Sequence, residues 1–217
     1  MALELKEREA IQQAVNLLQS LLTSSPPKPA EPTPKASPTP LQAFAWGKRF
    51  SPTAKAFLLQ TAKDFSWHPD WLPSCIAFET GETFSPKIKN PYSSGTGLIQ
   101  FMDQTCEELS KRWGETITTK KLAAMSVEQQ LEWVWKYFKM MIERVGNATS
   151  LEDVYMLIYW PAAVGKGLDT ALHTKDTRFY APNKGLDTNK DGIITKREAG
   201  RLVRSKLEEG LLPENYG

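Results

Sequence analysis

The apolar positions along the chain recur mostly at helical spacing. In residues 1–23, Ile11, Val15, Leu18 and Leu22 follow one another at alternating intervals of four and three. This spacing places them on one face of a helix of about five turns. So short a helix is rarely stable alone, so we expect its apolar face to be covered. Self-association or docking to a partner would cover it, and so would packing on the chain's own domain.

The next stretch, residues 24–41, interrupts the helical pattern. Its residues 24–40, SSPPKPAEPTPKASPTP, hold seven of the chain's 15 prolines and almost nothing apolar. Such a composition favours an extended, semi-rigid polyproline conformation over a packed core. We therefore expect a linker here, followed by one domain over residues 42–217.

Helical signals dominate this domain. Ser51 and Pro52 are typical of a helix start, Ser126 precedes the most regular apolar stripe, and Ser150 with Asp153 predicts a capping box. Strand signals are weak and leave open only a small hairpin within residues 84–97. The predicted fold is mainly α, with helices over residues 51–65, 73–82, 97–113, 126–145, 150–160 and 196–210.

Composition and charge narrow the class of protein. The net charge of +2 is too small to indicate nucleic acid as a partner, and it would not hinder approach to an anionic cell wall. No apolar run reaches the ~18 residues of a membrane span. The first residues, MALELKEREAIQQAV, are charged and do not resemble a secretory signal, so a substrate outside the cytoplasm would need another delivery route.

One carboxylate occupies an unusual position. Glu79 directly follows the apolar Cys75–Phe78 and precedes Thr80 and Gly81. It is either an exposed residue of an ordinary helix, or a partly desolvated acid that keeps its proton near neutral pH. An acid of the second kind donates a proton to the leaving oxygen when a glycosidic bond is cleaved. The segment GTGLIQF would bring the Gln100 amide to the same wall of a cleft.

The surrounding residues 78–102, FETGETFSPKIKNPYSSGTGLIQFM, resemble the signature of the lytic transglycosylase and goose-type lysozyme superfamily, especially its phage-borne members. A later segment, LIYWPAAVGK at residues 157–166, is similar to the Tyr-Asn-Ala-Gly element of that family, with Trp160-Pro161 in place of the expected Asn. The elements of the main signature follow in order as Glu79-Thr80-Gly81, Phe84-Ser85-Pro86, Ser94-Gly95 and Gly97-Leu98-Ile99-Gln100, with Glu82 and Thr83 as additions to its shortest form.

The resemblance implies a lysozyme-like helical domain that acts on peptidoglycan, with Glu79 as the general acid. A transglycosylase would use Glu79 alone, whereas a hydrolytic lysozyme would need a second carboxylate to activate water. Glu82 and Asp103 are the candidates, but each is otherwise an ordinary surface charge, which favours the single-acid reaction. The expected substrate-binding residues are Gln100, Tyr159, Tyr92 and Ser94.

A second motif lies near the C-terminus. Residues 187–198, DTNKDGIITKRE, fit the 12-residue EF-hand calcium loop, with Gly192 at the sharp turn and Ile194 as its apolar anchor. No second loop is available for pairing, so we expect one structural calcium ion that secures the C-terminal segment. Its expected ligands are Asp187, Asn189, Asp191, Ile193, Thr195 and Glu198.

Other functions are compatible with parts of the sequence. A cysteine peptidase would need Cys75 or Cys106 beside His68 or His173, and the two cysteines are either free or bridged. A non-catalytic, calcium-binding module for the cell wall would leave the Glu79 motif unexplained. A structural virion protein with an inactive lysozyme domain would suit the N-terminal helix and linker as a tether. We expect delivery inside a virion or release from the host cytoplasm.

Overall fold

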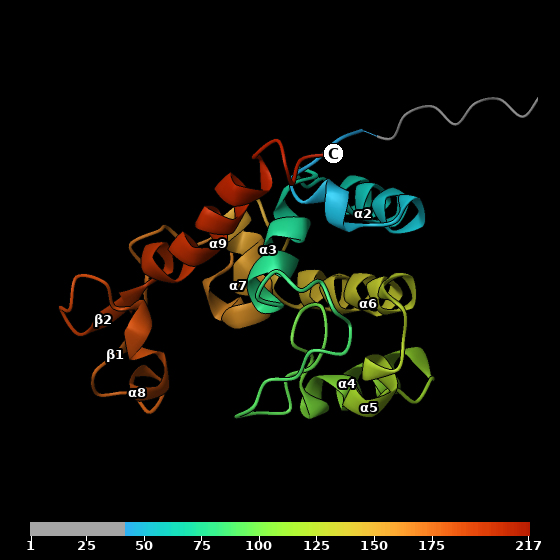
Figure 1. Ribbon diagram of the computed structural model, residues 1–217. Helices are drawn as coiled ribbons and strands as arrows, with labels where there is room; N and C mark the ends of the chain where they lie inside the picture. Colours follow the sequence, from blue (N-terminus) through green and yellow to red (C-terminus); the bar gives the residue numbers. More distant parts are fainter. Residues whose placement is uncertain (1–41) are drawn as a thin grey trace, which may run out of the picture. The chain divides into compact units, whose positions relative to one another are not determined.

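The structure is a computed structural model that describes residues 42–217, so the predicted helix of residues 1–23 and the predicted linker lie outside the described residues. The described part is mainly helical and contains one small antiparallel sheet (Figure 1). In chain order its elements are η1 (Gly47–Arg49), α2 (Pro52–Phe65), α3 (Trp71–Glu79), α4 (Asp103–Trp113), α5 (Thr119–Ala123), α6 (Val127–Val145), α7 (Leu151–Tyr159), η2 (Pro161–Ala163), β1 (Ala171–Thr174), α8 (Tyr180–Asn183), η3 (Lys184–Leu186), β2 (Ile193–Thr195) and α9 (Lys196–Gly210).

The expected helix starts agree with the structure at three helices. The Ser51 hydroxyl accepts a hydrogen bond from the Ala54 main chain at the start of α2. Ser126 forms a full capping box with Gln129 at the start of α6. Ser150 caps α7, but the predicted capping box is wrong, because the Asp153 carboxylate accepts from Thr149 instead. The polar side chains satisfy main-chain donors that would otherwise lack partners.

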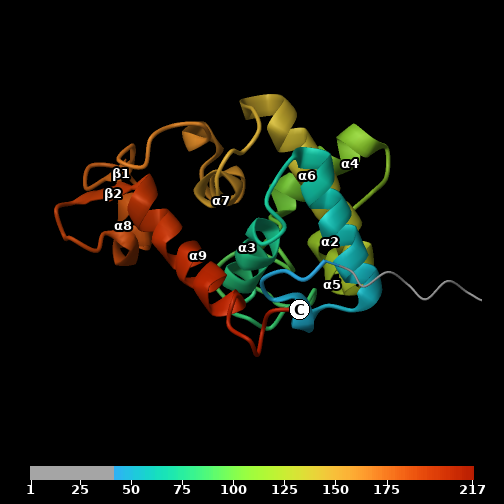
Figure 2. The ribbon, with the colours of Figure 1, turned by 90° about the horizontal axis from the view of Figure 1, so that it is seen from above.

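Helix α3 lies in the middle of the described unit. It packs against α9 on one side and α2 on the other, and α9 also packs along α7 (Figure 2). The approach of α7 and α9 is close, since a Cβ at Gly200 would lie 2.6 Å from the Cγ of Glu152. Cys75, Ile76 and Ala77 of α3 are completely buried. The helix that ends in Glu79 is therefore held by the core on most of its surface.

The two ends of the described chain are joined. Phe44 and Gly217 exchange main-chain hydrogen bonds, and the Trp46 indole donates to the Lys206 carbonyl at 2.7 Å. Phe44 and Trp46 are buried although no element was predicted there. This short segment thus packs against the C-terminal part of the domain.

The segment between α3 and α4 differs from prediction. The helix expected over residues 97–113 begins only at Asp103, because Gly97 and Gln100 have positive φ angles of 79° and 53° that end any helical path. The hairpin left open for residues 84–97 amounts to isolated bridges of Thr96 with Lys89 and with Phe101. None of the helices in the described part is long and apolar enough to cross a membrane.

The sheet lies elsewhere, close to the C-terminus. It pairs β1 with β2, and its register places His173 opposite Ile194 and Thr174 opposite Ile193. Strand β2 belongs to the predicted calcium loop, whereas β1 was not predicted. The loop therefore has a partner strand in this chain even though it has no second loop of its own kind.

Candidate active site

Glu79 is the last residue of α3 and projects into a cleft of about 210 Å³. The residue is half-buried, and the three residues before Phe78 are completely buried. The cleft is built from the end of α3, the loop before α4, and helices α4, α6 and α7. Its lining residues are Glu79, Ile99, Gln100, Phe101, Met102, Thr105, Tyr137, Ile158 and Tyr159.

The surroundings of Glu79 favour its protonated form. Burial raises the pKa of Glu79 from its ordinary value of 4.5 to about 7. Within the described part of the chain, no side chain forms an ion pair or hydrogen bond with this carboxyl group. Burial also raises the pKa values of Tyr137 and Tyr155, and the negative charge of ionised Glu79 raises them further. A substantial fraction of Glu79 thus holds a proton at neutral pH.

Two predicted substrate-binding residues share this cleft with Glu79. Gln100 adopts a positive φ, and its side-chain amide donates to the Gly97 carbonyl at 3.1 Å, which braces the loop. Tyr159 ends α7, and its hydroxyl lies 3.0 Å from the Nε2 of His173. Burial raises the pKa of Tyr159 to about 12, so it keeps its hydroxyl proton.

The other two predicted binding residues lie outside this cleft. Ser94 lines an adjoining pocket of about 330 Å³, which shares Met102, Thr105 and Tyr137 with the cleft. Tyr92 lines neither and is 96% exposed. The structure therefore brings Glu79 together with Gln100 and Tyr159, places Ser94 in the next pocket, and leaves Tyr92 on the surface of the loop.

The candidates for a second carboxylate are occupied elsewhere. Glu82 forms an ion pair with Lys206 of α9 at 2.5 Å. Asp103 accepts a hydrogen bond from Thr119 at 2.8 Å.

The adjoining pocket does contain a carboxylate that the sequence did not predict, Glu108, which pairs with Arg144 at 2.9 Å. Nothing in the sequence distinguishes Glu108 from other polar residues of an amphipathic helix.

The cysteines and histidines do not form a peptidase site. Cys75 and Cys106 are free and buried, and burial raises the pKa of both thiols. His68 is exposed and pairs with Asp70 at 3.2 Å, while His173 is buried against Tyr159. No cysteine contacts a histidine through a hydrogen bond in the described part of the chain.

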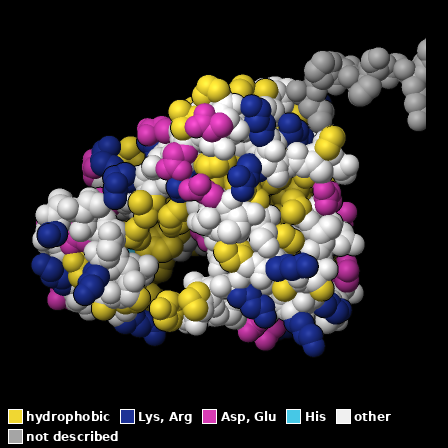
Figure 3. Space-filling model, viewed as in Figure 1, with side chains coloured by type: hydrophobic (Ala, Val, Ile, Leu, Met, Phe, Trp, Pro, Cys, Tyr) yellow, Lys and Arg dark blue, Asp and Glu magenta, His cyan; other side chains and the backbone are white. Residues whose placement is uncertain are grey.

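An aromatic cluster extends the Tyr159 side of the cleft. The ring of Trp160 packs edge-on against His173, and Phe179 lies against both. Phe179 is 38% exposed. Figure 3 shows hydrophobic side chains around a hollow that separates the end carrying β1, β2 and α8 from the rest of the described unit.

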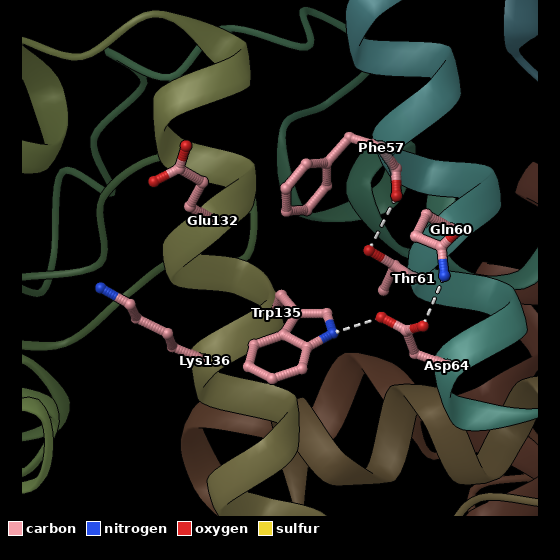
Figure 4. Close-up of a pocket in the computed structure, with 7 residues that line it drawn as sticks. All are labelled: Phe57, Gln60, Thr61, Asp64, Glu132, Trp135 and Lys136. Atoms are coloured by element: carbon pink, nitrogen blue, oxygen red, sulfur yellow. Dashed lines mark hydrogen bonds between the residues drawn. The ribbon is translucent and has the colours of Figure 1, made fainter. Parts of the chain in front are cut away.

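Another pocket lies between α2 and α6 and shares no lining residue with the cleft (Figure 4). It measures about 300 Å³, and the side chains of Phe57 from α2 and Trp135 from α6 point into the space between the two helices. The two oxygens of Asp64 already accept hydrogen bonds from Gln60 and Trp135. The pocket's other acid, Glu132, is exposed, as is Asp64. We therefore do not regard this pocket as the active site, because it contains no desolvated acid.

The predicted calcium loop is closed by hydrogen bonds. One oxygen of Glu198 accepts from the main chain and hydroxyl of Thr188, and the other accepts from the main chain and hydroxyl of Thr195. Gly192 has a φ of 89° and donates to the Oδ2 of Asp187. Asn189 and Asp191 hydrogen-bond to each other. The loop thus has the sharp turn at Gly192 that its sequence predicts, and its carboxylates are held by hydrogen bonds.

The oxygen donors of this loop fit a calcium ion. The Oδ1 of Asp187 is buried and has no hydrogen-bond partner among the described residues. In the described part, no three acidic, histidine or cysteine side chains converge as a metal site. Calcium also takes amide, hydroxyl and main-chain oxygens, which Asn189, Thr195 and Ile193 offer at the expected positions. The unpartnered oxygen of Asp187 is the observation that fits a cation.

Comparison with known proteins adds no family: no model of a known protein family matches the chain, and no curated protein matches it. The fold and the site define a mainly helical protein with a protonatable glutamate in a cleft. Its function is inferred from these residues and their geometry.

Proposed function

We propose that the protein cleaves the glycan strands of peptidoglycan as a lytic transglycosylase with a lysozyme-like catalytic domain. The observation that carries this proposal is the state of Glu79. Among the described residues, it is the only carboxylate that lines the cleft, and burial raises its pKa to about 7. The resemblance of residues 78–102 to the superfamily signature points to the same residue.

Glu79 would act twice in the reaction. It first donates its proton to the glycosidic oxygen between N-acetylmuramic acid and N-acetylglucosamine, and the bond from C1 to that oxygen breaks. The resulting carboxylate then accepts the proton of the muramic 6-hydroxyl, whose oxygen bonds to C1. The products are a 1,6-anhydro-muramic end and a free 4-hydroxyl on N-acetylglucosamine. No water is consumed, and Glu79 regains its proton.

The arrangement of carboxylates favours this reaction over hydrolysis. A hydrolytic lysozyme would need a second carboxylate with access to a water molecule at the cleavage site. Glu82 and Asp103 do not line the cleft and have partners of their own. Glu108 lies in the adjoining pocket and is paired with Arg144. Hydrolysis remains the alternative outcome of the same cleft.

The glycan would bind along the cleft and the adjoining pocket. Tyr159 offers a hydroxyl beside the acid, and Gln100 shapes the facing loop. Ser94 would contact a sugar one position further along, where the two pockets meet. Tyr92, exposed at the surface, would stack on a ring only if the loop closes over bound substrate, which makes it the least supported of the four.

We also propose that loop 187–198 binds one calcium ion with a structural role. The ligands would be the side chains of Asp187, Asn189, Asp191, Thr195 and Glu198 and the main-chain oxygen of Ile193. Such an ion would fix the loop and, through it, the start of α9, which packs behind α3 and α7. Catalysis itself would need no metal, since Glu79 supplies and recovers the proton.

The test is a product analysis with matched variants. Purified protein, Glu79→Gln and Glu82→Gln would be incubated with peptidoglycan, and the released muropeptides identified by mass. We expect anhydro-muramic ends from the wild type and from Glu82→Gln, and no release from Glu79→Gln. Glu82 is the control because it lies three residues from Glu79 yet forms its ion pair with Lys206.

Each alternative gives a different product. Reducing ends would identify a hydrolytic lysozyme. Intact glycan with cleaved peptides would identify a peptidase. Full activity of Glu79→Gln would disprove the central claim, and absence of any cleavage by folded wild-type protein would favour a binding or structural virion module. A virion or a route out of the host cytoplasm remains our proposal for delivery to the wall.

A further inference from the structure

His173 lies behind the wall of the cleft and contacts the lining residue Tyr159, 14 residues earlier in the chain. It lies on β1, is only 2% exposed, and its Nε2 is 3.0 Å from the hydroxyl oxygen of Tyr159. Tyr159 ends α7, and no motif in the sequence connects the two residues. The hydrogen bond thus joins the sheet at the calcium loop to the wall of the cleft.

The two rings are held in place by their neighbours. Tyr159 stacks in parallel on Tyr155, with ring centroids 5.5 Å apart. His173 is packed edge-on by Trp160, with centroids 4.6 Å apart, and tilted against Phe179. These contacts restrict the rotation of both side chains, so the distance between Nε2 and the hydroxyl is set by packing.

The direction of the hydrogen bond follows from the other ring nitrogen. The Nδ1 of His173 is buried and has no hydrogen-bond partner among the described residues. The nearby Leu172 carbonyl attracts a proton on the ring, but it makes no hydrogen bond of ordinary geometry with Nδ1. A hydrogen on Nδ1 would therefore have only this poorly aligned carbonyl as a partner in a buried site, and poorly paired donors are rarer in proteins than unpaired acceptors. The hydrogen belongs on Nε2, which donates it to Tyr159.

We propose that His173 is a positioning residue for the cleft. Its Nε2–H fixes the Tyr159 hydroxyl oxygen, so that the hydroxyl's own proton is directed into the cleft toward an oxygen of the bound glycan. The role of Tyr159 toward glycan rests on the proposed function. The hydrogen bond and its direction are properties of the protein alone.

The first experiment is nuclear magnetic resonance on the protein without substrate. The chain has only two histidines, so ¹⁵N-labelled imidazoles give two sets of signals, with exposed His68 as the internal control. We expect neutral His173 to carry its hydrogen on Nε2, and Tyr159→Phe to shift the His173 signals but not those of His68. A hydrogen on Nδ1, or a His173 ring that does not respond to Tyr159→Phe, would overturn the inference.

The second experiment measures glycan cleavage in variants. His173→Phe keeps an aromatic ring without the donor, and we expect kcat to fall roughly 10-fold with little change in KM. His173→Gln offers an amide donor and should recover part of that loss. Because His173 acts through Tyr159, His173→Phe combined with Tyr159→Phe should be no slower than Tyr159→Phe alone. If the two substitutions lower kcat independently, so that their factors multiply in the double variant, His173 has no positioning role. An unchanged kcat in His173→Phe would also refute that role.

The results separate this inference from the proposed function. If Glu79→Gln remains active, the proposed function fails while the resonance experiment still decides the hydrogen bond. If Glu79→Gln is inactive and His173→Phe is fully active, the positioning role alone fails. His68→Gln serves as the matched variant in the cleavage assay, whereas the intact His68 signals are the control in the resonance experiment. Should His173→Phe not fold, His173→Gln and the wild-type tautomer still decide the inference.

Discussion

The ammonium group of Lys196 lies 2.5 Å from the Oδ1 of Asp153, and both side chains are almost completely buried. The same ammonium donates to the carbonyls of Ala163 and Lys166. Asp153 belongs to the first turn of α7, and Lys196 begins α9 within the last turn of loop 187–198. This ion pair therefore fastens the end of that loop to the helix that carries Tyr159.

Removing Lys196 should destabilise the protein strongly. Lys196→Met leaves the Asp153 carboxylate buried without its cation, which typically costs about 3–5 kcal/mol of unfolding free energy. Urea unfolding measures the loss.

The adjacent Arg197 is the matched control, because its pair with Asp169 is exposed. Arg197→Gln should change stability by less than about 0.5 kcal/mol, and equal losses in both variants would contradict the importance of burial.

Glu79 should make the protein less stable as the pH rises. Its pKa is about 7 in the folded protein and 4.5 ordinarily, so the folded state binds more protons between these values. Stability therefore falls across that window as pH increases. Glu79→Gln has no charge to bury. Its free energy of unfolding should therefore exceed that of the wild type by about 1–3 kcal/mol at pH 8 and equal it at pH 4.

Thermal unfolding at several pH values measures this difference. Glu82→Gln is the control, since it removes an acid of the same type that is only partly buried and is paired with Lys206. That variant should show no gain at pH 8. If Glu79→Gln is no more stable than the wild type at pH 8, the carboxyl group is not desolvated in the folded protein.

Cleavage activity should decline as the pH rises through 7. Glu79 must carry its proton at the start of the reaction, so kcat/KM should fall above its pKa of about 7. Thr105 lines the cleft, and Thr105→Lys would place a positive charge near Glu79 and lower its pKa. The falling limb should then move to lower pH in Thr105→Lys and stay in place in Thr105→Gln. If kcat/KM falls at the same pH in both variants, the fall reports the titration of a group other than Glu79.

Local signals in the sequence predicted some elements well. Helix α6 has a cap at Ser126, an apolar stripe through Phe138 and a stop at Gly146, and it forms as expected. The segment before α4 has a similar apolar content, but the conformations of Gly97 and Gln100 depend on contacts far along the chain. The Gln130 side chain accepts from the Leu98 main chain and would collide with a Cβ at Gly97. No local pattern encodes that contact.

In the cleft, too, the residues of one local motif could be predicted, whereas those positioned by contacts between distant elements could not. Glu79 and Gln100 belong to one motif, so their proximity could be expected from the sequence. His173 and Glu108 could not be placed near the cleft, because their positions depend on the packing of β1 and α4 against other elements. Ser94 was predicted in the right loop but lies one pocket away, since the loop turns between it and Gln100.

Calcium should stabilise the protein through loop 187–198. An ion that binds only the folded state at 100 times its dissociation constant adds about 2.7 kcal/mol, or a rise of roughly 5–10 °C in Tm for a domain of this size. Thermal unfolding with calcium and with a chelator measures the shift. Chelation should also move the imidazole signals of His173, which lies opposite Ile194 in the sheet, and leave those of His68 unchanged.

Glu198→Gln isolates the contribution of the metal in this prediction. Glutamine can still reach back to the main chain of Thr195 as the glutamate does at the start of α9, so the helix cap is kept. The variant loses one of the carboxylates that a calcium ion requires. It also loses the oxygen that accepts from Thr188, so it should unfold at or somewhat below the temperature of the chelated wild type and show little response to calcium. A full calcium response in Glu198→Gln would place the ion elsewhere, and a wild type that ignores both calcium and chelator would show that hydrogen bonds alone hold the loop.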